Sequence, residues 1–320
     1  MKIYNSLINL RDYDGAQGLV LTIGIFDGLH CGHQKLLRFV KKIAKASKMI
    51  SAVMTFQPHP LKILNRLNYP PLLISVEHRL NLIEQFGIDV CFVIKFTRRF
   101  SKITPERFIE DFLIKRLNVR YLVVGEDFNF AKDKKGTVQF LKKIENANRL
   151  KMYVLSSVKY SQKKISSTRI RHLIEKGKLG IAAKLLGRPV SVLGTVISGS
   201  GRGKKLGFPT ANIDPHHEAI PPSGVYVVKL KYENKFYRAM LNIGQRPTFS
   251  CKNNVIEVHI FNFKRNIYGE NIEIFFLKKL RDERKFKNLN YLKRQLARDK
   301  IKTQNYIKSR QFGLNLQRVC

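Results

Sequence analysis

The feature that most constrains this chain is an apolar segment that leads through two histidines into a helix. Residues 19–26 are predicted to form a buried strand, and helical spacing of apolar residues follows His33 at Leu36, Leu37, Val40, Ile43 and Ala44. We therefore expect the helix to begin at His33. The bend holds His30 together with Gly28 and Gly32, which let the backbone approach a ligand closely. Because the free N–H groups and positive dipole end of the helix face this bend, the pattern predicts a nucleotide-phosphate site.

Strands and helices alternate through the first half of the chain. Further strands are predicted at 50–56, 90–94, 121–125 and 152–155, and helices at 76–86, from 104–105 onward and at 137–147. Strands separated by helices of this length favour a Rossmann-like, doubly wound parallel sheet within an α/β protein. The ligand crevice of such a sheet lies beyond the carboxyl ends of its strands.

Two further loops follow strands and are expected at the same sheet edge. One holds Pro58 and His59, and the other holds Asp127. Each also has a purely structural interpretation. The prolines around His59 fix a rigid turn in which the histidine is solvated, and Asp127 is an ordinary turn carboxylate.

A hydroxyl-rich segment ends this half of the chain. Ser166, Ser167 and Thr168 precede a helical run that carries Arg169 and Arg171. The hydroxyls are typical of a helix cap. They are equally suited to a phosphate, since helix N–H groups and two guanidinium groups would face the same anion. The two interpretations are compatible.

The pattern changes after residues 185–189. Short strands are predicted at 190–197, 224–232, 236–243, 255–261 and 271–277, and this succession indicates a small antiparallel β-barrel. A long amphipathic helix follows, with Leu289, Leu292, Leu296 and Ile301 on one face. We predict two domains, 1–186 and 187–320.

A glycine-rich segment lies between the first two strands of this second half. It contains Gly201, Arg202, Gly203, Lys204 and Gly207. A flexible hairpin loop is the default interpretation, and no helix opens here with the Lys and Ser/Thr of a P-loop. Thr210 and Asn212, however, are two apart on extended backbone and so face the same side. Their oxygen atoms are suited to Mg²⁺.

Composition limits the remaining function classes. The 320 residues, 44% of them hydrophobic, can bury two cores. Sixty basic and 23 acidic residues give a net charge of +37, which by itself favours a nucleic-acid-binding module. The Lys and Arg residues are nevertheless spread along the chain, so we expect no physiological nucleic-acid partner. The sequence also has no apolar run of about 18 residues, no secretory signal pattern and no Cys spacing typical of zinc. These features predict a cytoplasmic protein without a membrane partner.

Two sets of motifs resemble known enzymes. Residues 22–34 are similar to the HxGH motif of nucleotidylyltransferases, in the version of the flavin-adenylylating branch, and residues 166–171 match their Ser-Ser-Thr-x-Ile-Arg motif. Residues 199–212 match the Gly-x-Gly-Arg-Gly…Gly-Phe-Pro-Thr-Ala-Asn motif of riboflavin kinases, and the match continues through 280–283. The chain thus resembles the bacterial bifunctional riboflavin kinase/FAD synthetase family. It departs from that pattern at Ile25, usually Asn, at Asn129, usually Arg, and at Ala131, usually Gly.

The resemblance implies two ATP-dependent reactions, from riboflavin to FMN and from FMN to FAD, in a monomer or weak homo-oligomer. For adenylyl transfer it implies that His30, His33 and Arg169 are catalytic. Binding roles go to Gly28, Gly32, Pro58, His59, Asp127, Ser166, Ser167, Thr168 and Arg171.

For the kinase the resemblance implies nucleotide or flavin binding by Gly201, Arg202, Gly203, Lys204, Gly207 and Arg281, with Mg²⁺ on Thr210 and Asn212. Glu257 matches the family's carboxylate base, which would take the proton of the ribityl hydroxyl. Its apolar strand neighbours could raise its pKa by desolvation, although an outward Glu257 paired with a lysine is the alternative. The three departures leave a second alternative open, a relative in which only the kinase half works.

Overall fold

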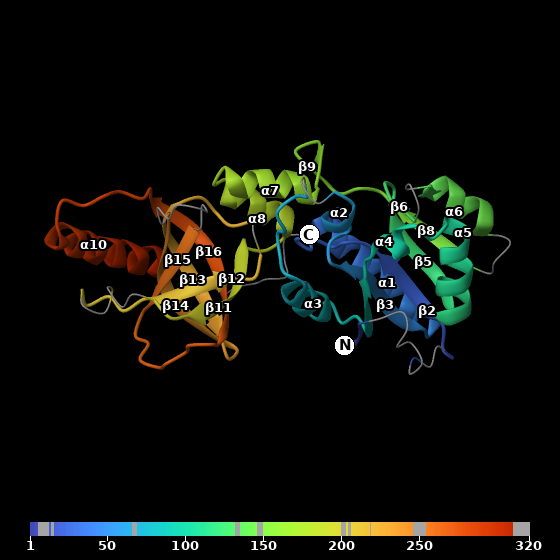
Figure 1. The fold of residues 1–320 in the computed structure, drawn as a ribbon, viewed down its shortest axis with the longest axis horizontal. Helices are drawn as coiled ribbons and strands as arrows, with labels where there is room; N and C mark the ends of the chain where they lie inside the picture. The colour runs from blue at the N-terminus through green and yellow to red at the C-terminus, as the bar shows by residue number, and fades with distance from the viewer. Residues whose placement is uncertain are drawn as a thin grey trace. The chain divides into compact units, whose positions relative to one another are not determined.

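The chain folds into two compact units. The computed structural model describes residues 1–5, 13, 16–65, 69–131, 135–145, 150–199, 203, 206–217, 219–245 and 254–309. The first unit comprises Met1–Pro70 and Val76–Ser166, and the second comprises Pro71–Ser75 and the described residues from Ser167 onward. Figure 1 shows the elements of both units along the chain.

The first unit is built on a six-stranded parallel sheet, as predicted. The strand order is β1-β4-β3-β2-β5-β8, with bounds β1 (Lys2–Tyr4), β2 (Leu19–Ile23), β3 (Ile50–Gln57), β4 (Val90–Lys95), β5 (Val119–Gly125) and β8 (Lys151–Leu155). The strand at β1 was not predicted; it pairs in parallel with β4. The chain moves outward from β2 through β3 to β4 and then returns to the other side of β2. This reversal places the expected ligand crevice between β2 and β5.

Helices cover both faces of this sheet, and for this reason every residue of β2 is buried. On one face, Leu19, Leu21 and Ile23 pack with Leu113 and Leu117 of the helical segment before β5. The helices of the unit are α1 (Cys31–Ser47), α2 (Pro60–Leu64), α3 (Val76–Glu84), α4 (Arg98–Ser101), α5 (Pro105–Arg107), the π-helix η2 (Phe108–Arg116) and α6 (Val138–Glu145). Two short hairpins complete it, β6 (Asn129–Phe130) with β7 (Gly136–Thr137), and β9 (Lys159–Tyr160) with β10 (Lys163–Lys164).

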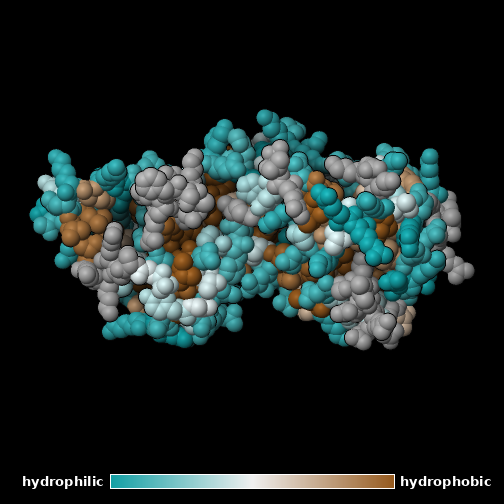
Figure 2. Space-filling model, viewed as in Figure 1, coloured by the Kyte–Doolittle hydropathy of each residue, from teal (hydrophilic) through white to brown (hydrophobic). Residues whose placement is uncertain are grey.

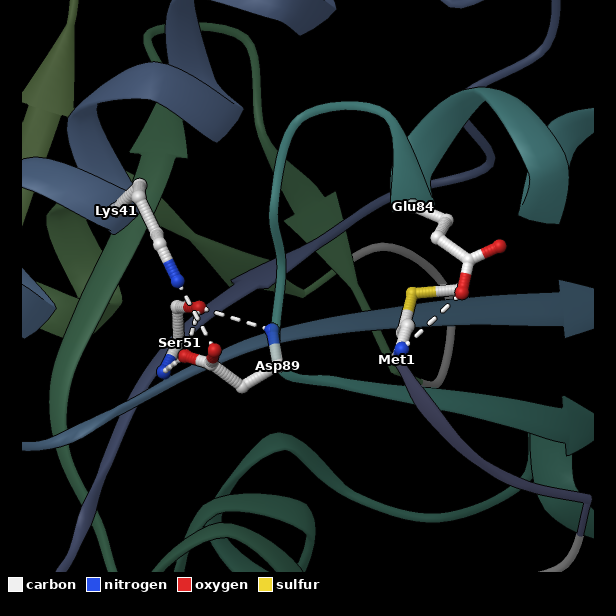
Figure 3. A network of polar contacts seen from close by, with 5 residues as sticks. All are labelled: Met1, Lys41, Ser51, Glu84 and Asp89. Carbon is white, nitrogen blue, oxygen red and sulfur yellow. Dashed lines mark hydrogen bonds and ion pairs between the residues drawn. The ribbon is translucent and has the colours of Figure 1, made fainter.

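A polar network joins α1 to the amino ends of β3 and β4 (Figure 3). The Asp89 carboxylate accepts hydrogen bonds from the Ser51 backbone N–H at 3.0 Å and from the Lys41 ammonium at 2.9 Å. Burial would raise the pKa of Asp89, but the hydrogen bond from the Ser51 hydroxyl, together with those from Lys41 and the Ser51 N–H, outweighs it and lowers the pKa. Met1 is tied down nearby, since its amino group lies 3.1 Å from the Glu84 carboxylate.

The second unit is a closed antiparallel barrel, as predicted. Its order is β11-β12-β15-β14-β13-β16, with bounds β11 (Ser191–Ile197), β12 (Ala211–Pro215), β13 (Gly224–Tyr232), β14 (Lys235–Gln245), β15 (Asn254–Ile260) and β16 (Asn271–Arg281). Closure leaves no strand edge without a partner. Strand β12 was not predicted as an element, because it is only five residues long and ends in proline. Among the described residues of this unit, the helices are α7 (Ser167–Glu175), α8 (Leu179–Leu186) and α10 (Leu289–Lys308).

The predicted apolar face of α10 is only partly correct, since Leu292 and Leu296 are half-buried and line the barrel cavity but the other two predicted residues are exposed. Leu289 is 67% exposed and Ile301 is 57% exposed, and Figure 2 shows hydrophobic residues at the surface over this helix. The residues that α10 buries are instead Gln295, Asp299, Thr303 and Ile307. These recur every four positions and so form one stripe. Polar contacts with the barrel, described below, decided which face packs.

Candidate functional site

The two histidines lie in the turn between β2 and α1. Helix α1 begins at Cys31 and not at His33 as predicted, because His30 is its N-cap. The His33 backbone N–H donates to His30 Nδ1 at 3.4 Å, so an imidazole takes the place of the usual capping oxygen. Gly28 has φ of 78°, a left-handed conformation that glycine adopts without strain.

The imidazole rings of His30 and His33 stack, with 3.6 Å between their centroids and 15° between their planes. The rings of Phe26 and His33 form a T-shaped contact, with 5.2 Å between their centroids. A Cβ at Gly32 would lie 3.2 Å from the His30 ring, tighter than most real contacts. The glycine therefore makes room for the stacked pair, in addition to the ligand approach expected from the sequence.

The turn contains two non-glycine residues in the left-handed region, Phe26 at φ 53° and Leu29 at φ 39°. Such residues persist only where their surroundings fix them. One such contact comes from Gln34, which is buried and donates from Nε2 to the Leu29 carbonyl at 2.9 Å. The backbone of the histidine turn is thus held in a conformation that it would not adopt alone.

Burial lowers the pKa of His33 well below its ordinary value, and the charges of His30 and Arg79 lower it further. His33 is therefore a neutral imidazole at neutral pH, with one ring nitrogen able to donate and the other to accept. Its Nδ1 is buried and has no hydrogen-bond partner among the described residues.

The predicted neighbouring loops follow β3 and β5, the two strands on either side of β2. After β3, His59 caps α2 by accepting the Leu61 N–H at 3.1 Å on Nδ1, and Pro58 follows a cis peptide bond. After β5, Asp127 is 62% exposed and forms an ion pair with Lys164. Both loops thus lie at the same end of the sheet as the histidine turn.

The hydroxyl-rich segment crosses from the first unit to the second. Ser166 ends the first unit, whereas Ser167, Thr168 and Arg169 open helix α7. Arg171 is buried and donates from Nε to the Pro71 carbonyl at 2.6 Å, a contact within the second unit. Arg171 therefore has a structural role that its sequence pattern did not indicate, and its binding role stays a prediction.

A cavity of about 700 Å³ opens at the barrel and gathers several of the predicted kinase residues. Gly203, Thr210, Glu257 and Arg281 line it together. Four further polar residues there were not named as site residues from the sequence, Asn242, His259, Glu283 and Arg284. Gly207, with φ of 81°, lies in the turn before Phe208, and Gly201, Arg202 and Lys204 lie outside the described residues.

Glu257 stands in the middle of a polar row across three strands. It pairs in register with Asn212 of β12 on one side and with Asn242 of β14 on the other. Directly opposite residues project from the same face of a sheet. A Cβ at Gly199 would overlap the Asn212 side chain, so this glycine permits the close approach of the loop to that residue. The predicted metal ligand and the predicted base are thus cross-strand neighbours.

His259 supports the segment that carries Thr210. Its Nδ1 lies 2.7 Å from the Pro209 carbonyl oxygen, to which only an N–H can donate, and its ring packs edge-on against Phe208 at 5.5 Å. Burial lowers the pKa of His259, although the bond to Pro209 acts in the opposite direction. A sequence signal existed, since His259 lies two residues from Glu257 and so on the same side of β15.

Helix α10 holds Arg281 at the rim of the cavity. Asp299 is 1% exposed and accepts from Arg281 Nε at 3.0 Å, and its other oxygen accepts from Gln295 Nε2 at 2.7 Å. This buried ion pair explains why a polar stripe of α10 packs on the barrel. The four-residue helical spacing links Gln295 to Asp299, but no spacing in the sequence links Arg281 to either of them.

Comparison with known proteins finds one family model along each half of the chain. The FAD synthetase family model matches residues 13–169, and the riboflavin kinase model matches residues 186–307. Among curated proteins, the bifunctional riboflavin kinase/FMN adenylyltransferase of Buchnera aphidicola subsp. Schizaphis graminum is 40% identical, covering 93% of this chain and 96% of its own. That of Bacillus subtilis (strain 168) is 39% identical, covering 90% and 92%. The chain belongs to the bifunctional riboflavin kinase/FMN adenylyltransferase family.

A solved structure is similar over both units. It comes from Streptococcus pneumoniae, is titled a macrolide-efflux protein, and is 32% identical with a TM-score of 0.83, covering 95% of this chain and 99% of its own. Within the part of the chain that the structure describes, no helix is both long and apolar enough to cross a membrane. The two polar sites described above are therefore the candidate sites for the two reactions of this family.

Proposed function

We propose that this chain phosphorylates riboflavin to FMN in the barrel cavity and transfers AMP from ATP to FMN, giving FAD, at the histidine turn. The observation that supports the first reaction best is the convergence of Thr210, Glu257 and Arg281 on one cavity. The second is supported by the stacked His30 and His33 at a helix N-terminus.

In the kinase step, Glu257 takes the proton of the ribityl hydroxyl, whose oxygen attacks the γ-phosphorus of ATP. The bond from that phosphorus to the β,γ-bridging oxygen breaks, and ADP leaves. The position of Glu257 between Asn212 and Asn242 supports this role, because the two amides can orient the carboxylate. Arg281, held by Asp299, can neutralise phosphate or flavin charge at the rim.

In the adenylyl transfer step, a phosphate oxygen of FMN attacks the α-phosphorus of ATP, and pyrophosphate leaves. No base is needed, because the attacking group is already an anion. His30 and His33 stabilise the α-phosphate and the departing β- and γ-phosphates by donating hydrogen bonds. Arg169, Ser166, Ser167, Thr168 and Arg171 are proposed to bind the nucleotide as well, on the strength of the family motif.

Both reactions are proposed to use Mg²⁺, and the kinase residues fit this cation. Thr210 lines the cavity, Asn212 is buried at its cross-strand position beside Glu257, and hydroxyl, amide and carboxylate oxygens are the donors that Mg²⁺ prefers. Bound there, the cation would neutralise charge on the transferred phosphate. Thr210 and Asn212 would hold it.

We further propose an adenylyl transfer domain at 1–186 and a kinase domain at 187–320, a sequence division that keeps α7 and α8 with the first half although they pack in the second compact unit. The chain is proposed to work in the cytoplasm as a monomer or weak homo-oligomer without nucleic-acid or membrane partners. Support for the boundary comes from α8, which ends at Leu186 and is followed by a left-handed Gly187, and from the riboflavin kinase match that begins at residue 186. Size-exclusion chromatography with light scattering tests the oligomeric state.

Incubation of the purified chain with riboflavin, ATP and Mg²⁺, followed by chromatography, tests both activities at once. We expect FMN to form first and FAD to follow. FMN without FAD would favour the alternative in which only the kinase half works, an alternative motivated by Ile25, Asn129 and Ala131. Unchanged riboflavin together with no FAD from supplied FMN would refute the proposal.

A further inference from the structure

Arg79 is a buried cation to which neither proposed reaction gives a role. It lies on α3, is 1% exposed, and its Nη1 donates to the Thr55 hydroxyl at 2.7 Å and to the Phe56 carbonyl at 3.4 Å. Its Nε is buried and has no hydrogen-bond partner among the described residues. Burying a guanidinium in this way is costly, so the fold must gain from its presence.

Thr55 connects this cation to the histidine turn. While accepting from Arg79, the Thr55 hydroxyl donates to the Ile25 carbonyl at 3.2 Å. Ile25 immediately precedes Phe26, the first left-handed residue of the turn. The turn is thus anchored at its start by Thr55 and at its end by Gln34, which binds the Leu29 carbonyl. The Thr55 hydroxyl is held in its donating orientation because Arg79 occupies its acceptor side.

Arg79 also contributes charge to the same place. Its positive charge is one cause of the low pKa of His33. The charge of His30, the N-cap of the helix that carries His33, is another. Burial lowers the pKa of Arg79, while the buried Asp27 of the turn and Cys91 of β4 act in the opposite direction. Burial raises the pKa of the Cys91 thiol to about 12, so this group stays neutral. Arg79 is therefore a fixed cation beside Asp27 and the histidines.

We propose that Arg79 is a positioning residue for adenylyl transfer, which orients Thr55 so that the Ile25 carbonyl and the turn carrying His30 and His33 are fixed for the nucleotide phosphates. This inference rests on the proposed adenylyl transfer at the histidine turn. It adds a support from two elements, β3 and α3, that lie outside the HxGH motif.

Two variant pairs separate geometry from charge. Thr55→Val removes the hydroxyl and keeps the cation, whereas Thr55→Ser keeps both. In the full-length chain, Thr55→Val should lower kcat for FAD formation about tenfold while KM for ATP changes by less than about threefold, because a displaced turn misaligns the reacting groups. Thr55→Ser should restore kcat. Phosphorylation of riboflavin by the same preparation is the internal control and should not change.

The second pair is Arg79→Met and Arg79→Lys. Arg79→Met removes the cation, so the pKa of His33 should rise and the acid limb of the kcat/KM profile for FAD formation should move to higher pH. Arg79→Lys and Thr55→Val both retain a cation beside His33, and their acid limbs should stay with that of the wild type. If Arg79 had only a structural role, all of these variants would be less stable. The acid limb of Arg79→Met would then not differ from the limbs of the other variants.

The outcomes distinguish the inference from the function on which it rests. If the wild type forms no FAD from supplied FMN, the proposed function fails. If the wild type forms FAD and Thr55→Val keeps kcat within twofold, or if the limb of Arg79→Met coincides with that of Arg79→Lys, the inference fails. Should Arg79→Met lose its kinase activity through misfolding, the Thr55→Val and Thr55→Ser pair still decides.

Discussion

The two sites differ in how far along the chain their residues lie. The histidine turn is built from nine consecutive positions, 26–34, and the hydrogen bonds from His33 and Gln34 close within it, while Thr55 of β3 anchors the residue just before it. The barrel cavity instead gathers Thr210, Asn242, Glu257 and Arg281 from segments that only barrel closure brings together. Local motifs can be recognised in a sequence, while a gathered site depends on register. The kinase site should accordingly be the more sensitive to distant substitutions.

The largest expected effect is on the gathered site. Glu257→Gln should reduce FMN formation by about 10²–10⁴-fold, the usual range for loss of a general base, while FAD formation from supplied FMN continues. Gln preserves the shape of the side chain, so a loss reports chemistry and not collapse of the cavity. Initial rates with riboflavin and with FMN check this. Full kinase activity in the variant would show that the Asn212–Glu257–Asn242 row has another purpose.

His33→Ala is the matching change at the local site. It should reduce FAD formation by at least about 10²-fold, since a hydrogen bond to the developing charge of the transition state is removed. FMN formation should be unchanged, because the barrel does not contain this residue. Parallel product chromatography measures both. Normal FAD formation would exclude His33 from catalysis and leave His30 alone to be tested.

Asp299→Asn tests whether the kinase site is sensitive to a substitution on a helix outside the barrel strands. It leaves Arg281, whose side chain is largely buried, without its counter-charge, at a cost of roughly 3 kcal/mol for breaking such a pair. We expect a higher KM for riboflavin or ATP in the kinase reaction and an unchanged FAD-forming rate. Steady-state kinetics and urea unfolding give the two readouts. Equal losses in both reactions would show that the sites are less independent than their construction suggests.

Ala131→Gly tests the segment that follows β5, at the same end of the sheet as the histidine turn. Ala131 has φ of 63°, a left-handed conformation that costs a non-glycine residue about 1–2 kcal/mol. Glycine removes this cost but adds unfolded-state entropy of about 0.5–1 kcal/mol, so the net gain lies between zero and about 1.5 kcal/mol. A small rise in Tm by calorimetry is expected. A fall in Tm would mean that Ala131 makes contacts worth more than its strain.

The smallest effect concerns the network at Asp89. Because the pKa of Asp89 is lowered in the folded chain, its contribution is fully present above the unfolded pKa of about 3.9 and is lost as pH falls through the folded value. Half of the side chain is exposed, which limits the contribution to a few tenths of a kcal/mol. The Tm difference between wild type and Asp89→Asn should therefore shrink below about pH 4. A difference constant with pH would show that charge is not its source.

Much of the fold followed from the sequence. Period-two and period-3.6 apolar patterns are local, and they predicted the strands β3, β13 and β15 within one residue at each end. The errors arose where local pattern competed with tertiary contacts. Helix α1 starts two residues early because His30 caps it, and α10 buries a polar stripe because Asp299 has a partner eighteen residues away on β16.

By itself, then, the sequence determined the two-part architecture and both motifs, since each depends on residues close together along the chain. Only the tertiary structure decided which side chains surround them. It set Asn212 and Asn242 on either side of Glu257 through strand register, and it placed Arg79 of α3 behind Thr55 and the histidine turn. The physical reason is that burial and register couple residues at any separation, while propensity and spacing extend over only a few positions.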